Sequence, residues 1–453
     1  MFSRFYDDGL AQASFVVGCH RTKRAVVVDP RRDAAIYVEA ARQAGATIVA
    51  VIETHVHADF VSGARELASI GLPVITGPGA ALAYEHHEVR DHETLQVGDL
   101  GLTFLHTPGH TFEHIAILAE APGEAARLFT GDLLFVGGVG RPDLLGERET
   151  RALAGMLHQS LRRVAALDPS TEVHPGHGAG SLCGAGIGLD PSSTIGREWS
   201  QNPLLRDTPD QAFVEAVLAD LPDTPPYFAR MKRLNLAPDV LGLASGTPAL
   251  PSIRPAAAAA LAADGAIVID LRPAAEFAAG HPDGAINLAY GAKVGYWAGW
   301  VLPPDAPLIL FGGSAGQAAD AAMQLRRIGL DRIEGMVDGG FSAWQAASLP
   351  VASIQQVDAE ALRARDDLYV VDVRSAHEWR ADHAPGAVNI PVGDLPARVG
   401  ELPPGRTIAT ICEGGYRSSL ASSLLAQEGI AVVNVAGGMA AYRGSPQSVA
   451  DRH

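Results

Sequence analysis

The stretch Glu53-Thr-His-Val-His-Ala-Asp-Phe60 directly follows a β-branched apolar run, residues 46–52, that has the length of one strand. Two histidines and an aspartate therefore leave a strand end and enter a loop. Three later segments have the same character: Thr107-Pro-Gly-His110, Thr130-Gly-Asp132 and His174-Pro-Gly-His177. Imidazole and carboxylate groups are ordinary ligands of zinc, iron and manganese. The four segments predict a metal site at the strand ends of a layered α/β domain.

The order THVHAD, TPGHT, TGD and HPGHG resembles the metallo-β-lactamase superfamily. This resemblance implies an αββα sandwich whose loops carry metal at one sheet edge. Binuclear hydrolases of that superfamily, such as glyoxalase II, have the motif H-x-H-x-D-H, whereas this chain has Phe60 in place of the last histidine. The change removes one ligand of a second metal and leaves Asp59 and His177 beside a bridging Asp132. We therefore expect a mononuclear site.

With the later stretch Gly138-Val-Gly-Arg141-Pro-Asp143, the pattern is similar to the persulfide dioxygenases. The resemblance implies one Fe(II) per chain, held by His55, His110 and Asp132, with His57 either a weak ligand or a neighbour of the ligands. Affinity alone cannot select iron, because zinc binds more tightly than Fe(II) to a given set of ligands. A facial set of two histidines and one carboxylate, however, suits Fe(II) and O2 chemistry.

Three further residues are candidates for substrate binding, namely Arg141, Asp143 and Cys183. Arg141 either neutralises an anionic group of the thiol carrier or bridges to Asp143 and holds the loop. Cys183 either relays a sulfane sulfur or is a packed thiol, and we favour the packed thiol. The histidine-rich segment Tyr84-Glu-His-His87 is interpreted as a polar helix and loop near the mouth of the site and not as ligands.

The end of the chain contains one pattern twice, each time over about 100 residues. The segment Val268-Ile-Asp270-Leu-Arg272 matches Val370-Val-Asp372-Val-Arg374, and Gly339-Gly340 matches Gly437-Gly438. Each copy alternates strands and helices and resembles a rhodanese domain, a small parallel α/β sheet. The domains expected are 1–245, a metallo-β-lactamase-fold dioxygenase domain; 246–352, an inactive rhodanese-like domain; and 353–453, a catalytic rhodanese domain.

In the second copy, a strand at residues 407–411 leads into Cys412-Glu-Gly-Gly-Tyr-Arg417 and then into a helix. Backbone N–H groups, the helix N-terminus and Arg417 should lower the pKa of this thiol below its unperturbed ~8.5. By resemblance, Cys412 accepts a sulfane sulfur and holds it as a persulfide. The first copy has Gly312 and Gln317 at the positions of Cys412 and Arg417, so we expect a spacer, a docking surface or a dimer element there.

Charge and cysteine usage exclude other classes of function. The chain has 35 basic and 51 acidic residues, a net charge of −16, and no Lys/Arg cluster, which argues against nucleic-acid binding. No apolar run reaches the length of a membrane span, and we expect no membrane association and a cytoplasmic protein. The three cysteines, Cys19, Cys183 and Cys412, are odd in number and widely spaced, which fits a reducing compartment without disulfides.

These resemblances imply an iron-dependent enzyme of sulfide detoxification. It would oxidise a low-molecular-weight thiol persulfide with O2 to sulfite and thiol, and exchange sulfane sulfur with sulfite and thiosulfate through Cys412. A thioester hydrolase like glyoxalase II is one alternative, against which Phe60 argues. A sulfur-carrier protein, which binds persulfide without oxidising it, is another. The thiol carrier, the direction of sulfur flux and the oligomeric state, a homo-oligomer included, stay open.

Overall fold

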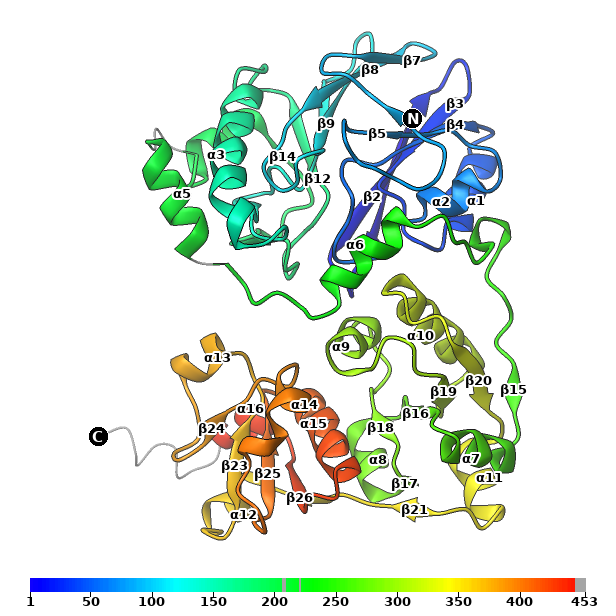
Figure 1. Ribbon diagram of the computed structural model, residues 1–453, viewed down its shortest axis with the longest axis vertical. Coiled ribbons are helices and arrows are strands. Elements are labelled where there is room, and N and C mark those ends of the chain that lie inside the picture. Colours follow the sequence, from blue (N-terminus) through cyan, green and yellow to red (C-terminus); the bar gives the residue numbers. More distant parts are fainter. Residues whose placement is uncertain (206–208, 220, 445–453) are drawn as a thin grey trace. The chain divides into compact units, whose positions relative to one another are not determined.

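The computed structural model describes residues 1–205, 209–219 and 221–444, which form two compact units (Figure 1). The first unit contains Met1–Pro248 together with Arg326–Gly329, and the second contains Ala249–Leu325 and Leu330–His453. Among the described residues, no helix combines the length and the apolar character that a membrane crossing requires.

Two mixed sheets form the frame of the described part of the first unit. The strand order of the first sheet is β1 (Phe2–Asp7), β2 (Gln12–Cys19), β3 (Arg24–Val28), β4 (Thr47–Ile52), β5 (Val74–Thr76) and β6 (His87–Glu88). The order of the second is β14 (Ser193–Thr194), β12 (Glu172–Pro175), β10 (Arg127–Gly131), β9 (Ile115–Glu120), β8 (Leu100–His106) and β7 (Thr94–Val97). The strands β11 (Val139–Gly140) and β13 (Gly184–Ala185) pair with each other.

The two sheets share an apolar core because alternate strand residues point to the same side. This core contains Phe15 and Ile52 from the first sheet and Phe104, Ile117 and Phe129 from the second. Helices pack on the outer faces: α1 (Ala35–Gln43) and α2 (Ala64–Ala68) on the first sheet, and α3 (Glu147–Val164) and α5 (Asp210–Ala219) on the second. The layering of helix, sheet, sheet and helix confirms the αββα sandwich (Figure 1).

The other helical elements of this unit are α4 (Ile195–Gln201), α6 (Phe228–Leu236) and the 3-10 helix η1 (Leu243–Ser245). One local prediction is wrong: residues 84–87 contain no helix. His87 instead enters β6, where it pairs in parallel with Ile75 of β5, so the sheet ladder holds this segment extended. The sequence predicts a helix around residues 209–220. Residue 220 lies outside the described residues, and the observed helix α5 ends at Ala219.

The repeat in the second unit has the same strand order in both copies, with parallel pairing along each sheet. In the first copy the order is β15 (Ser252–Ile253), β20 (Ile333–Val337), β19 (Leu308–Phe311), β16 (Ile267–Asp270) and β18 (Ile286–Asn287). In the second it is β22 (Gln355–Val357), β26 (Val432–Val435), β25 (Ile408–Ile411), β23 (Tyr369–Asp372) and β24 (Val388–Asn389). Equal strand order confirms that one α/β fold occurs twice.

Helices connect the strands of both copies. The first copy has α7 (Pro255–Ala263), α8 (Ala274–Ala279), α9 (Val294–Val301), α10 (Ala315–Arg327) and α11 (Gly340–Ala346). The second has α12 (Ala359–Arg363), α13 (Ala376–Ala381), α14 (Leu395–Arg398), the 3-10 helix η2 (Val399–Glu401), α15 (Tyr416–Gln427) and α16 (Gly438–Gly444). A short pair, β17 (His281–Pro282) and β21 (Val351–Ala352), completes the first copy.

Candidate metal centre and sulfur site

Three buried side chains that follow three different strands converge in the first unit. His55 follows β4, His110 follows β8 and Asp132 follows β10. The Nε2 atoms of His110 and His55 lie 3.5 and 3.8 Å from the Oδ2 atom of Asp132. Among the described residues, these three atoms are buried without a hydrogen-bond partner, which is costly unless a cation binds them. The donor set therefore fits a metal ion.

The ring orientation of both histidines keeps Nε2 available as a ligand atom. Thr54 donates its hydroxyl proton to Asp29, with Oγ1 2.9 Å from Oδ2, and lies 2.9 Å from Nδ1 of His55. The hydroxyl therefore accepts a hydrogen bond from Nδ1 of His55. Likewise, Nδ1 of His110 donates to the carbonyl oxygen of Arg141 at 2.8 Å. Burial lowers the pKa of both His55 and His110, which favours the neutral imidazoles that a metal requires.

His177 connects the ligand Asp132 to Asp59. Its Nδ1 lies 2.8 Å from Oδ1 of Asp132, and its Nε2 lies 2.8 Å from Oδ2 of Asp59. Both ring nitrogens must donate, so the ring is protonated; burial opposes this charge, but the two carboxylates hold the pKa of His177 well above its ordinary value. Phe60 is fully buried and offers no ligand atom. This geometry fits the expected mononuclear site.

His57 lies beside the three ligands without joining them. Its ring centroid is 4.2 Å from that of His55, but its Nε2 faces Asp29 Oδ1 at 3.3 Å and Glu53 Oε2 at 3.5 Å. Of the two alternatives for His57, this geometry favours the neighbour of the ligands over the weak ligand. His55 and His57 are two residues apart on an extended chain, so their side chains can rotate independently. The carboxylates of Asp29 and Glu53 attract the ring of His57.

The guanidinium of Arg141 is bonded within the protein. Its Nε and Nη2 each lie 2.7 Å from an oxygen of Asp143, while Nη1 donates to Leu182 O at 2.9 Å and Nη2 to Thr224 Oγ1 at 2.7 Å. The side chain is 1% exposed. Of the two alternatives for Arg141, the geometry supports the one in which it holds the loop. The same residue's carbonyl oxygen orients His110.

Cys183 lies near the metal centre and is buried. Its sulfur and ligand atoms of Asp59 and His177 all lie within 4.8 Å of one another. Burial, followed by the charges of Asp59 and Asp132, raises the pKa of Cys183 well above its ordinary value. A neutral thiol packed against the site fits these surroundings.

The second candidate site surrounds Cys412, directly after β25. The backbone N–H of Gly415 donates to the sulfur at 3.1 Å, and the Ser418 hydroxyl lies 3.4 Å from it. The helix α15 begins at Tyr416, so its N-terminus faces the thiol. Arg417, which was expected to stabilise the thiolate, forms two bonds of 2.6 and 2.7 Å to Glu378. The carboxylate of Glu378 therefore partly neutralises the positive charge of this arginine.

The corresponding loop of the first copy, with Gly312 and Gly313, lines a cavity of about 780 Å³. Gly312 adopts a φ of +75°, and a Cβ added to it would lie 2.5 Å from Cγ of Arg272. Gln317, at the position of Arg417, accepts a hydrogen bond from the backbone N–H of Ser314 at 2.8 Å. A side chain at position 312 would therefore require Arg272 to move, and the glycine found there carries no thiol.

The first copy nevertheless contacts the helix of the active copy. Ser419 donates to Oδ1 of Asn287 at 2.6 Å, and the backbone N–H of Asn287 donates to the Ser423 hydroxyl at 3.1 Å. In addition, a Cβ added to Gly393 would lie 2.3 Å from Cε3 of Trp300, so this tryptophan packs against the second copy. The two copies thus contact each other within the second unit.

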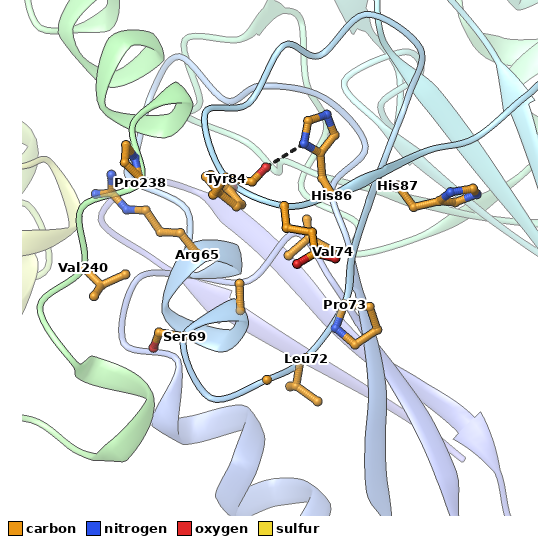
Figure 2. A pocket seen from close by; sticks show the side chains of 13 residues that line it. Arg65, Ser69, Leu72, Pro73, Val74, Tyr84, His86, His87, Pro238 and Val240 are labelled. Atoms are coloured by element: carbon orange, nitrogen blue, oxygen red, sulfur yellow. Dashed lines mark hydrogen bonds between the residues drawn. The ribbon is translucent and has the colours of Figure 1, made fainter.

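A further cavity, of about 660 Å³, lies beside α2 and β5. Figure 2 shows the side chains that line it, including Tyr84, His86, Arg65 and Val240. Nδ1 of His86 bonds to the carbonyl oxygen of Tyr84 at 2.8 Å. The lining contains no residue of the predicted ligand set, which agrees with the interpretation of these histidines as polar surface residues.

A buried cluster of two histidines and one aspartate at the strand ends of an αββα sandwich defines a metal-binding metallo-β-lactamase fold. Residues 7–177 match the family model "Metallo-beta-lactamase superfamily", and residues 255–347 and 355–445 match "Rhodanese-like domain". A solved metallo-beta-lactamase from Staphylococcus aureus subsp. aureus COL is 32% identical, with a TM-score of 0.65, over 74% of this chain and 98% of that chain. The chain belongs to the metallo-β-lactamase superfamily and carries two rhodanese-like domains after the metal-binding domain.

Curated relatives match the first domain. Hydroxyacylglutathione hydrolase from Tolumonas auensis is 37% identical over 159 residues, which are 34% of this chain and 57% of the relative. The protein of the same description from Chromohalobacter salexigens is 36% identical over 155 residues, again 34% of this chain and 57% of the relative. The chain thus spans less than two thirds of the length of these relatives.

Proposed function

We propose that the chain is an iron-dependent persulfide dioxygenase with sulfurtransferase activity. One observation carries this proposal: ligand atoms of His55, His110 and Asp132 lie within 4.8 Å of one another. His55 Nε2, His110 Nε2 and Asp132 Oδ2 are buried and have no hydrogen-bond partner among the described residues. Two histidines and one carboxylate leave positions on Fe(II) for other molecules. The second metal position of a binuclear hydrolase has lost a ligand at Phe60, and His177 is bonded to both carboxylates that would serve it.

In this proposal, one Fe(II) per chain would supply the redox chemistry that O2 needs. The overall reaction consumes one persulfide, one O2 and one water, and yields one thiol and one sulfite with two protons. The chain's own residues fix the ligands: Thr54 holds Nδ1 of His55, the carbonyl oxygen of Arg141 holds Nδ1 of His110, and His177 holds Oδ1 of Asp132. These bonds preset the ring planes and the ligand protonation state before any substrate binds.

Cys412 would carry sulfur in the second activity. Its thiolate attacks the terminal sulfur of a persulfide, the S–S bond of the donor breaks, and the donor leaves as a thiol after taking one proton. Attack by sulfite on the outer sulfur of the Cys412 persulfide then restores the thiolate and forms thiosulfate. The N–H of Gly415 donates to the sulfur and stabilises its negative charge in both steps. The first copy would only support this chemistry, since Gly312 has no thiol.

The partners in this proposal are a small thiol persulfide, O2, sulfite and thiosulfate, with no nucleic acid or membrane. The proposed compartment is the cytoplasm. All three cysteines lie within the described residues and none is in a disulfide, which fits a reducing environment.

Dissolved O2 is the measurement that tests the proposal. Anaerobically purified, iron-containing protein should consume O2 when mixed with glutathione persulfide or coenzyme A persulfide, and one sulfite should form per O2. The faster of the two substrates identifies the thiol carrier. Persulfide bound without O2 uptake would instead support the sulfur-carrier alternative.

A thioester hydrolase is the second candidate, favoured by the relatives described as hydroxyacylglutathione hydrolases. Those relatives match only the first domain, and Phe60 removes a ligand that a binuclear site needs. Hydrolysis of S-lactoylglutathione without O2 uptake would favour this second function over the first.

The variant Arg141→Ala should lower kcat/KM for the persulfide by tenfold or more, equal to about 1.4 kcal/mol of transition-state stabilisation. The substitution removes the side-chain bonds to Asp143, Leu182 and Thr224. The backbone of residue 141 is then less firmly held, and with it the carbonyl oxygen that orients His110. Steady-state kinetics and metal analysis together check this result. A raised KM with full metal retention would return Arg141 to substrate binding, and an unchanged kcat/KM would remove both roles.

A further inference from the structure

A segment outside the residues that match the metallo-β-lactamase model is bonded to the loop that carries metal-site residues. Asn235, in α6, is buried and makes three bonds to the loop 57–62. Its Nδ2 donates to His57 O and to Phe60 O, both at 2.8 Å, and its Oδ1 accepts from the backbone N–H of Ser62 at 2.8 Å. Residue 235 lies beyond residues 7–177, which match the metallo-β-lactamase model, so the contact joins the matched region to a later segment.

Other side chains fix the backbone around Asn235. Arg65 of α2 donates to the carbonyl oxygens of Leu234 and Ala237 at the end of α6. Glu66 accepts from the backbone N–H groups of Leu241 and Leu243 at 2.8 and 2.9 Å. We call residues 234–243 the α6 strap.

The middle of the α6 strap borders a cavity. Pro238 and Val240 line the cavity of about 660 Å³ beside α2, as Figure 2 shows, so this stretch of the strap borders open space. The position of Asn235 over the ligand loop therefore depends on named hydrogen bonds that single substitutions can remove.

We propose that Asn235 is a positioning residue of the metal centre. The three bonds of its carboxamide fix the turn 57–62, and Asp59 lies inside that turn. Asp59 holds Nε2 of His177, and His177 in turn holds Oδ1 of the ligand Asp132. The carboxamide thus sets the place of Asp132 through two intermediate side chains, Asp59 and His177.

The carboxamide is suited to this role because it has both N–H donors for the two carbonyl oxygens and an acceptor oxygen for Ser62. An aspartate of the same shape could still accept from Ser62 but would donate to neither His57 O nor Phe60 O, and its charge would repel both carbonyl oxygens. The turn would open on the side of Asp59, and the bond from Asp59 to His177 would lengthen. Looser support of a ligand typically lowers metal affinity ten- to a hundredfold.

The test is the rate of metal loss from full-length Asn235→Asp. Wild type and variant are loaded with Co(II), the visible spectrum is recorded, and the release of metal to excess chelator is followed. We expect release at least tenfold faster, with a changed Co(II) spectrum. The matched control is Asn434→Asp: Asn434, in β26 of the second unit, is also buried, and its Nδ2 donates to Gln356 Oε1 at 3.2 Å. It should release metal within about twofold of the wild-type rate.

Release from Asn235→Asp at the wild-type rate would overturn the proposal, and so would equal acceleration in both variants, which would indicate general destabilisation. If Asn235→Asp does not fold, Asn235→Ser replaces it, since serine is too short to span the turn; a folded serine variant with wild-type retention overturns the proposal equally. The proposal depends on the ligand set of His55, His110 and Asp132 and not on the reaction. Failure of the wild type to hold metal would reject the ligand set, whereas absence of O2 uptake would leave the retention result valid.

Discussion

Replacement of Cys412 by serine is expected to reduce sulfur transfer from persulfide or thiosulfate by at least about a thousandfold. Serine keeps the size of the side chain and the contacts of the loop, so the fold should persist. Its hydroxyl, however, stays protonated at neutral pH and cannot hold a sulfane sulfur as a persulfide. The measurement is the rate at which sulfite is converted to thiosulfate in the presence of a persulfide donor.

The other two cysteines provide matched controls for this experiment. Cys19→Ser and Cys183→Ser each remove one buried thiol and leave the Cys412 loop intact. Both should retain sulfur transfer, and rapid alkylation of the wild type should stop it while leaving one blocked thiol at position 412. Transfer that survives in Cys412→Ser would contradict the assignment, and loss in Cys183→Ser would point to the relay alternative.

His110→Ala should lose both the metal and O2 uptake. The substitution removes one of three ligands, while Asp132 and His55 keep the other two, so the remaining site has a strongly reduced affinity. Elemental analysis of the purified wild type should give about one iron per chain, and the variant should have only a trace. Persulfide-dependent O2 uptake should fall to the rate without protein.

His87→Ala is the matched control, since His87 is an exposed residue of β6, a strand that none of the ligands follows, and its Nε2 bonds to Glu93 Oε1 at 2.7 Å. It should retain its iron and its activity. Two zinc ions per chain in the wild type would contradict the mononuclear iron site, as would full metal retention in His110→Ala.

The convergence of His55, His110 and Asp132 could be predicted from the sequence because the position of a residue at a strand end is a local property. A β-branched run followed by His55, and similar runs before His110 and Asp132, suffice to place all three at one sheet edge. The fold followed from the same layering. His57 shows the limit of this reasoning, since its alternation with His55 suggested convergence, while its torsions follow the charges of Asp29 and Glu53.

Long-range support could not be predicted from one sequence. Asn235 lies 175 or more residues from the carbonyl groups that it binds, and no periodicity marks an asparagine in a helix for such contacts. The choice between the two roles of Arg141 likewise needed the bonds to Leu182 and Thr224. By contrast, Asp29 directly follows the strand β3, and this position in the sequence indicates a polar side chain at the same sheet edge as the ligands.

The bonds between Asn287 and the serines of α15 have a consequence for the stability of the repeat. A duplicated copy that has lost its nucleophile would ordinarily be free to disappear by deletion. Here the helix that begins at the reactive thiol presents Ser419 and Ser423 to the other copy, and deletion would expose both hydroxyls and release the helix from its neighbour. Loss of the first copy is therefore expected to destabilise α15 beside Cys412, and the two copies should unfold together.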